Sequence, residues 1–130
     1  MAEQFAVIIM GSDSDLPLVK NTLDVLSGFG IKYEARVASA HRTPDVVSSY
    51  VQDAEKRGAA VFICAAGLAA HLAGAVAART TRPVIGIPVD GGPLNGVDAL
   101  YSTVMMPGGI PVATVAVGKA QPPLMRLAPS

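Results

Sequence analysis

Residues 39–44, which read SAHRTP, contain one of the two histidines in the sequence. Histidine is the side chain whose unperturbed charge change falls nearest neutral pH, so His41 can both give and take a proton. Arg42 follows directly and can hold a phosphate or a carboxylate through two parallel hydrogen bonds. The segment therefore predicts a proton carrier beside an anion-binding group. The alternative interpretation is a solvent-facing loop histidine next to a helix start.

A second polar cluster, GSDSD at residues 11–15, follows an apolar run. It stands at a predicted helix start, where free backbone amides and the helix dipole favour an anion. A carboxylate repels phosphate but accepts hydrogen bonds from sugar hydroxyls. We therefore assign Ser12 to a phosphate and Asp15 to a ribose. The alternative is that Ser14 and Asp15 only cap the helix.

The second histidine lies in AAGLAAHLAG, residues 65–74, which is otherwise apolar. The glycines suit a loop that folds over a ligand and offers backbone amides to it. His71 stands at a predicted helix start, whose dipole disfavours a positive charge on the ring. A structural role, with the ring bonded to backbone beneath the loop, fits the sequence equally well. Cys64, just before this segment, is expected to be a core residue.

Alternating strand and helix patterns must position these clusters. Buried strands are predicted at residues 5–10 and 60–65, two further strands at 83–89 and 112–117, and a half-exposed strand near a sheet edge at 31–37. Helical patterns with short connections separate them, which indicates a parallel α/β sheet of about five strands in the flavodoxin-like order 2-1-3-4-5. Ligands bind at the carboxyl ends of such strands. The order brings together both histidines with Ser12, Asp15, Ser39 and Arg42.

Helix faces and ends are also predicted. The first helix is expected to pack on the sheet through an apolar stripe, namely Leu16, Val19, Leu23 and Leu26. Thr43 is expected to cap the second helix, with Pro44 in its first turn and Gly58 at its end. Residues 97–106 are expected to form a short helix before the last strand.

The composition indicates a protein that associates with copies of itself, and the alternative is a monomer with a surface rich in alanine and glycine. Only 15% of the 130 residues are charged, 51% are hydrophobic, and the mean hydropathy is +0.44. Ordinary soluble domains are about 25% charged. Zero net charge without a basic run argues against nucleic acid as a partner, and no apolar run reaches the roughly 18 residues of a membrane span. With one cysteine and no signal-peptide pattern, a soluble cytoplasmic protein is expected.

Several familiar sites have no support in the sequence. The two histidines lack the cysteine partners of a zinc site. No G-x-G-x-x-G or Walker loop follows the first strand, and no G-x-S-x-G elbow is present for a serine hydrolase.

Five segments in order, MGSDSD, SAHRTP, AGLAAHLAG, GVDALYS and MPGGIPVATVAVGKA, resemble the aminoimidazole ribonucleotide carboxylase family of purine biosynthesis, in its class I form. The similarity runs from about Ala6 to Ala120. It implies a three-layer α/β/α sandwich, usually a homo-octamer, that uses no metal, cofactor or ATP. The reaction it implies moves a carboxylate from the exocyclic nitrogen of 5-(carboxyamino)imidazole ribonucleotide to ring carbon C4, by decarboxylation and recapture of CO2.

The resemblance also implies roles for particular residues. His41 matches the family's proton shuttle, and the substrate contacts match Ser12, Asp15 and Arg42, with Ser39 nearby. The loop that covers the base and the carboxylate matches Gly67, Ala70, His71 and Leu72. Ala73 stands where family members commonly have proline. Residues 1–120 would form one domain, and residues 121–130 replace the family's C-terminal helix with an irregular tail.

Two other functions are compatible with these residues. The class II relatives carboxylate aminoimidazole ribonucleotide directly with CO2, but they usually have lysine after the histidine, where this chain has Arg42. A non-catalytic, ribonucleotide-binding flavodoxin-like module is the other alternative. A phosphoreceiver is not supported, because it needs an aspartate where this chain has Cys64, Ala65 and Ala66.

Overall fold

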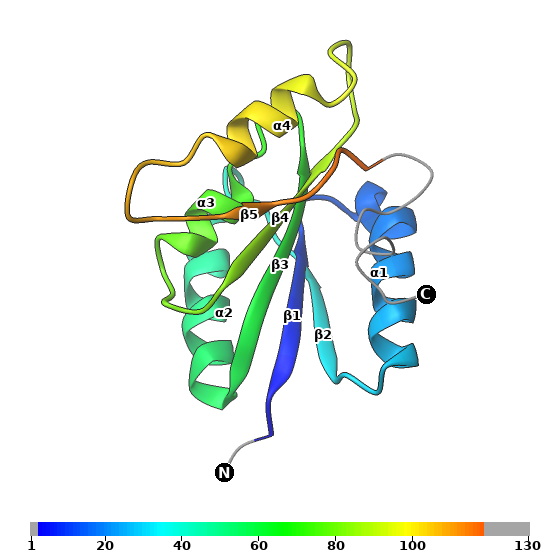
Figure 1. Ribbon diagram of the computed structural model, residues 1–130. Helices are drawn as coiled ribbons and strands as arrows, with labels where there is room; N and C mark the ends of the chain where they lie inside the picture. Colours follow the sequence, from blue (N-terminus) through cyan, green and yellow to red (C-terminus); the bar gives the residue numbers. More distant parts are fainter. Residues whose placement is uncertain (1–2, 119–130) are drawn as a thin grey trace.

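Five parallel strands form one sheet in the computed structural model, which describes residues 3–118 (Figure 1). The strands are β1 Phe5–Met10, β2 Tyr33–Val37, β3 Ala59–Gly67, β4 Val84–Val89 and β5 Ala113–Thr114. Their spatial order is β2-β1-β3-β4-β5, and each neighbouring pair is parallel. The predicted α/β class and flavodoxin-like strand order are confirmed.

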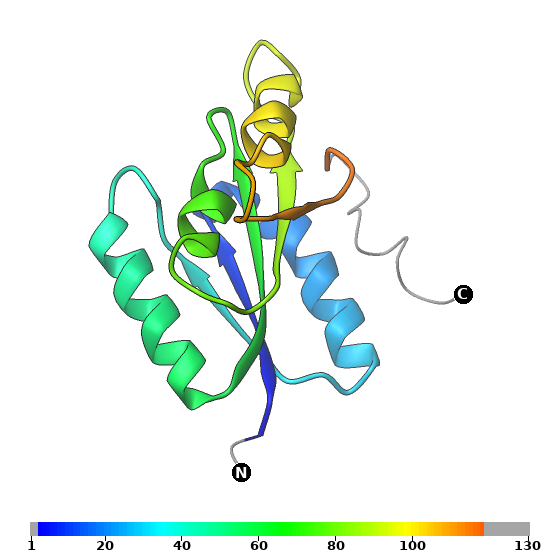
Figure 2. The same ribbon diagram turned by 60° about the vertical axis from the view of Figure 1, so that its left-hand side comes forward.

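Helices cover both faces of the sheet, so the molecule has three layers. Helices α2 (Pro44–Arg57) and α3 (Leu72–Ala77) pack on one face, and α1 (Leu16–Gly28) packs on the other, as Figure 2 shows. Helix α4 (Val97–Val104) joins the face of α3, because Thr103 of α4 and Ala73 of α3 both meet Gly86 of β4.

Strand β1 is an interior strand of the sheet, between β2 and β3. Val7 and Ile9 point to the α2 and α3 side, and Ile8 and Met10 point to the α1 side. All four are buried. A parallel strand with helices over both faces has no solvent side, which explains why this stretch of sequence is an unbroken apolar run.

The stripe predicted for α1 is wrong at Leu16, which is 47% exposed. A short 3-10 turn, η1 at Asp13–Asp15, precedes the helix and sets its rotation. Leu18 and Val19 are the buried residues of the first turn, and Leu16 lies about 200° around the helix from Leu18. Leu23 and Leu26 pack against the core as predicted.

The fifth strand is shorter than the predicted 112–117. Only Ala113–Thr114 pairs regularly with β4, and an isolated bridge then joins Gly118 to Val89. The side of β4 that faces β5 presents Gly86, Pro88 and Asp90. Proline has no backbone N–H to donate, so the hydrogen bonding between β4 and the last segment is interrupted opposite Pro88. It resumes one residue out of register.

Strand β2 forms one edge of the sheet, as predicted, although its apolar side chains are not well covered. Tyr33 is 38% exposed and Val37 is 54% exposed.

The predicted domain end at residue 120 and the predicted tail at 121–130 lie outside the described residues. No helix within residues 3–118 is long and apolar enough to cross a membrane.

Candidate active site

The loops after β1, β2, β3 and β4 surround one cavity of about 1150 Å³. They meet there because the carboxyl ends of parallel strands share one edge of the sheet. The cavity is lined by all but one of the predicted site residues, namely Ser12, Asp15, Ser39, His41, Arg42, Gly67, His71 and Leu72. The exception is Ala70, which is 2% exposed and lies beneath the loop.

The loop that carries His41 is held by hydrogen bonds between its two ends. The Ser39 amide donates to Thr43 Oγ1 at 3.0 Å, and the Thr43 amide donates to the Ser39 carbonyl at 2.9 Å. The Ser39 hydroxyl accepts from the Arg42 amide at 3.1 Å. Thr43 does precede α2, but its hydroxyl closes this loop and makes no capping bond to the helix. His41 is thereby placed at the exposed tip of a closed turn.

The two histidines are in direct contact. Nε2 of His41 and Nδ1 of His71 lie 2.7 Å apart, and the rings meet edge to face at 83° with their centroids 4.9 Å apart. His71 is exposed and immediately precedes α3, so it is not packed beneath the loop. The predicted strand order explains why the two loops converge. The bond between the rings depends on side-chain geometry that spacing does not reveal.

At the cluster after β1, the alternative that Ser14 and Asp15 only cap the helix is wrong. The Ser12 hydroxyl, not Ser14 or Asp15, accepts from a backbone amide, that of Ser14 at 3.2 Å. Asp15 makes no capping bond and is 9% exposed at the cavity wall. Burial raises the pKa of its carboxyl, a hydrogen bond with the Ser12 backbone opposes that shift, and repulsion from Asp13 adds to it.

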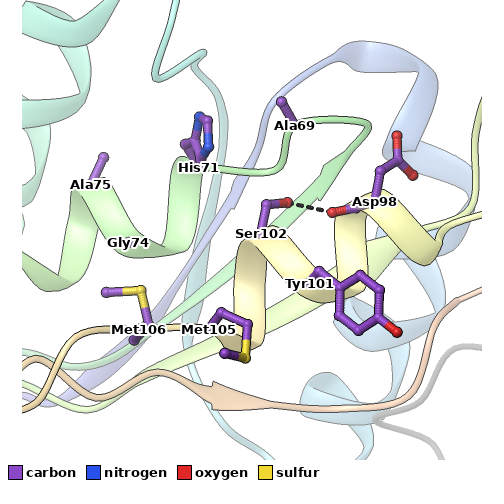
Figure 3. A pocket seen from close by; sticks show the side chains of 9 residues that line it. All are labelled: Ala69, His71, Gly74, Ala75, Asp98, Tyr101, Ser102, Met105 and Met106. Carbon is purple, nitrogen blue, oxygen red and sulfur yellow. Dashed lines mark hydrogen bonds between the residues drawn. The ribbon is translucent and has the colours of Figure 1, made fainter.

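The loop after β3 is anchored on α4. The Ala70 amide donates to the Ser102 hydroxyl at 2.8 Å, and this hydroxyl donates to the Asp98 carbonyl at 2.7 Å. Figure 3 shows Ser102 on α4 facing the loop that carries Ala69 and His71. Ser102 was not among the predicted residues, because nothing in the local sequence distinguishes it from other serines in helices.

A second cavity, of about 860 Å³, lies between α3 and α4 and shares Ala69 and His71 with the first. Its wall is largely apolar and includes Tyr101, Met105 and Met106 (Figure 3). His71 therefore lies between the main cavity and a largely apolar one.

The charges around the main cavity are mixed. Arg42 is the one arginine or lysine that lines it within residues 3–118, and Asp13, Asp15 and Asp90 supply carboxylates. Cys64 is buried in β3, as expected, and burial raises the pKa of its thiol. Among residues 3–118, no group of three or more His, Cys, Asp or Glu side chains could hold a metal ion.

Residues 6–123 match the family model described as AIR carboxylase. N5-carboxyaminoimidazole ribonucleotide mutase of Thermotoga maritima is 57% identical over 114 residues, which are 88% of this chain and 67% of the relative. Phosphoribosylaminoimidazole carboxylase of Saccharomyces cerevisiae is 52% identical over 120 residues, 92% of this chain but 21% of the relative. The crystal structure of Treponema denticola PurE superimposes with a TM-score of 0.80 at 32% identity, covering 88% of this chain and 73% of that one.

Proposed function

The chain belongs to the AIR carboxylase family, and on that basis we propose that it is an N5-carboxyaminoimidazole ribonucleotide mutase. It would move the carboxylate from the exocyclic nitrogen to ring carbon C4 of the same ribonucleotide. The observation that carries the proposal is the convergence of His41, Arg42 and Asp15 on one cavity at the carboxyl ends of the strands. The 57% identity to a curated mutase supports the same reaction.

In the proposed reaction, His41 moves the proton. As the bond between the exocyclic nitrogen and its carboxyl group breaks, His41 gives a proton to that nitrogen and CO2 is released. C4 then attacks the CO2, and His41 removes the proton from C4. One proton leaves the imidazole and one returns, so no metal or cofactor is needed to balance the step.

The substrate's phosphate and ribose are held by groups on the loops after β1 and β2. We assign Arg42 and Ser12 to the phosphate and the Asp15 carboxylate to the ribose hydroxyls, with Ser39 shaping the Arg42 turn. The apolar loop at Gly67, His71 and Leu72 would exclude water above the base, which slows escape of CO2. Buried Ala70 contributes by fixing this loop to Ser102.

The proposal is tested by supplying the carboxyamino substrate and measuring the C4-carboxylated product. His41→Asn keeps a polar side chain of similar size but cannot carry a proton. We expect its kcat to fall by at least about a hundredfold while ribonucleotide binding persists. Turnover within tenfold of the parent would contradict the role of His41. Ribonucleotide binding without turnover by the parent would support the non-catalytic module instead.

Direct carboxylation is a second candidate, because the yeast relative that is 52% identical is called a carboxylase. The two reactions differ in substrate. Efficient turnover of aminoimidazole ribonucleotide at low bicarbonate concentration, without the carboxyamino compound, would favour the carboxylase.

We further propose a cytoplasmic homo-oligomer, and an octamer as in the family the sequence resembles. Support comes from helix α4 and Met105 directly after it, which expose four apolar side chains at helical spacing, namely Val97, Tyr101, Val104 and Met105. Such a stripe is expected to be covered by another subunit. The single cysteine, buried as Cys64, suits a reducing compartment.

A further inference from the structure

We propose that His71 is the positioning residue of His41: the two rings share one proton across their contact, and the sharing fixes which nitrogen of His41 meets the substrate. This inference rests on the proposed function, since it assigns a task to the proton that His41 carries. It gives His71 a role different from contacting the carboxylate.

Hydrogen bonds within the protein fix the backbone on both sides of the His41–His71 contact, without a substrate. His41 sits on the turn closed by Ser39 and Thr43. The His71 backbone is fixed by its amide, which donates to the Ala69 carbonyl at 2.9 Å, and by its carbonyl, which accepts from the Ala75 amide at 2.9 Å. The two loops follow β2 and β3, which lie on opposite sides of β1. The contact therefore bridges the carboxyl end of β1.

A hydrogen bond between two ring nitrogens needs one donor and one acceptor. Only one of the facing nitrogens can hold a proton, so the two rings cannot both be fully protonated while the 2.7 Å contact lasts. Because the contact uses Nε2 of His41, Nδ1 is the His41 nitrogen left for the substrate. When Nδ1 carries a proton of its own it is a donor, and the shared proton then lies on His71. When Nδ1 has given its proton away it is an acceptor, and the shared proton then lies on Nε2 of His41.

This exchange matches the needs of the proposed reaction. The pair starts with protons on Nδ1 of His41 and on both nitrogens of His71. His41 gives its Nδ1 proton to the exocyclic nitrogen as the carbamate breaks, and the shared proton shifts from His71 to Nε2 of His41, which leaves both rings neutral. When C4 releases its proton to Nδ1, the shared proton returns to His71. The pair begins and ends with the same number of protons. The protonation state of His41 is thus set by its neighbour as well as by solvent.

Other charged and titratable groups surround the pair and will influence its titration. Those lining the two adjoining cavities are Asp13, Asp15, Arg42, Asp90, Asp98 and Tyr101. Because these groups are the same in every His71 variant, a comparison between variants isolates the effect of the second ring.

The test compares His71→Leu, which removes the hydrogen bond, with His71→Asn, whose amide can still donate from near the position of Nδ1. For His71→Leu we expect kcat to fall about tenfold or more with little change in KM. His71→Asn should retain more of kcat, and its pH profile should show a single titration in place of the coupled one. A raised KM with unchanged kcat in both variants would overturn the inference, because it would make His71 a simple substrate contact.

Nitrogen-15 NMR of histidine-labelled protein tests the pair without any turnover. In the parent, we expect the two rings to titrate in coupled steps with the facing nitrogens in opposite states. In His71→Asn, His41 should titrate in one step. If the titration and tautomer of His41 are the same in both proteins, the rings do not share a proton. If the parent shows the coupling but no mutase activity, the proposed function fails and the pair stands.

Discussion

Among single residues, Asp15 is a buried carboxylate, and burial disfavours its charged form. Its raised pKa means that the folded protein releases this proton less readily than the unfolded chain does. Ionised Asp15 therefore lowers stability at neutral pH, and the penalty disappears as the pH falls below the ordinary value of 3.8. A buried charge that weakens the fold is typical of a residue kept for binding.

Replacing Asp15 with asparagine should therefore raise the melting temperature at pH 7 and weaken ribonucleotide binding. The gain in melting temperature should be smaller near pH 3, where the parent carboxyl is already protonated in both states. Thermal unfolding at the two pH values measures this. Asp13→Asn, at an exposed neighbouring carboxylate, is the control and should give a much smaller gain at pH 7. An equal gain in the control would show that burial of Asp15 has no such cost.

At the level of elements, a polar cluster ties edge strand β2 to helix α2. Glu34 of β2 accepts from Tyr50 Oη at 2.8 Å and from Arg57 Nη2 at 3.0 Å, and Arg57 also pairs with Asp53. Chiefly because of the Arg57 bond, the pKa of Glu34 is lowered from 4.5 to about 2. Charge at Glu34 therefore stabilises the fold above about pH 4.5, and this contribution is lost as the pH falls toward 2.

We expect Glu34→Gln to lower the free energy of unfolding by about 1 kcal/mol at pH 7. The difference from the parent should shrink at pH 4 and again at pH 3, because the parent loses the same contribution. Urea denaturation across this range is the measurement. Glu3→Gln, which breaks an exposed pair with Lys32, serves as the control and should change stability little at any pH. A difference that stays constant from pH 7 to pH 3 would contradict the assignment.

The approach of α4 to the sheet depends on Gly86. A Cβ at this position would lie 2.4 Å from Cγ2 of Thr103 and 3.1 Å from Cγ1 of Val112. Gly86→Ala should therefore lower the free energy of unfolding by about 1–3 kcal/mol, measured by urea denaturation. Adding Thr103→Ser removes the clashing methyl group and should recover part of that loss. If the second change recovers nothing, contact with α4 is not the cause.

How far elements can be predicted depends on whether local pattern decides them. The bounds of β1 follow from its apolar run, which is a local pattern. The bounds of α2 follow from Pro44 at its start and Gly58 at its end, which are local signals as well. The rotation of α1 depends on a 3-10 turn, and the length of β5 depends on Pro88 in another strand. The convergence of site loops follows from strand order, whereas the His41–His71 bond and the Ser102 anchor require side-chain positions.

For the whole molecule, the exposed side of α4 is the feature that the isolated chain leaves unexplained. Met105 is 76% exposed and Tyr101 is 61% exposed, on a protein with few charges elsewhere. Such a surface is unfavourable in water and favours association.

Met105→Glu should therefore reduce the molar mass in solution, measured by light scattering after size-exclusion chromatography. A carboxylate in an apolar subunit contact has no partner and opposes burial. Lys56→Glu changes charge on exposed α2 and should leave the mass unchanged. The same mass for both variants would show that α4 is not a subunit contact.

Ser102 joins helix α4 to the loop that carries His71. Its hydroxyl accepts from the amide of Ala70, next to His71. The same helix exposes Tyr101, and Met105 directly after the helix is exposed as well. A subunit contact that stabilises α4 would therefore also stabilise the backbone that carries His71. Specific activity would then depend on protein concentration. A dilute enzyme would lose turnover per chain even with saturating substrate, and would regain it on concentration.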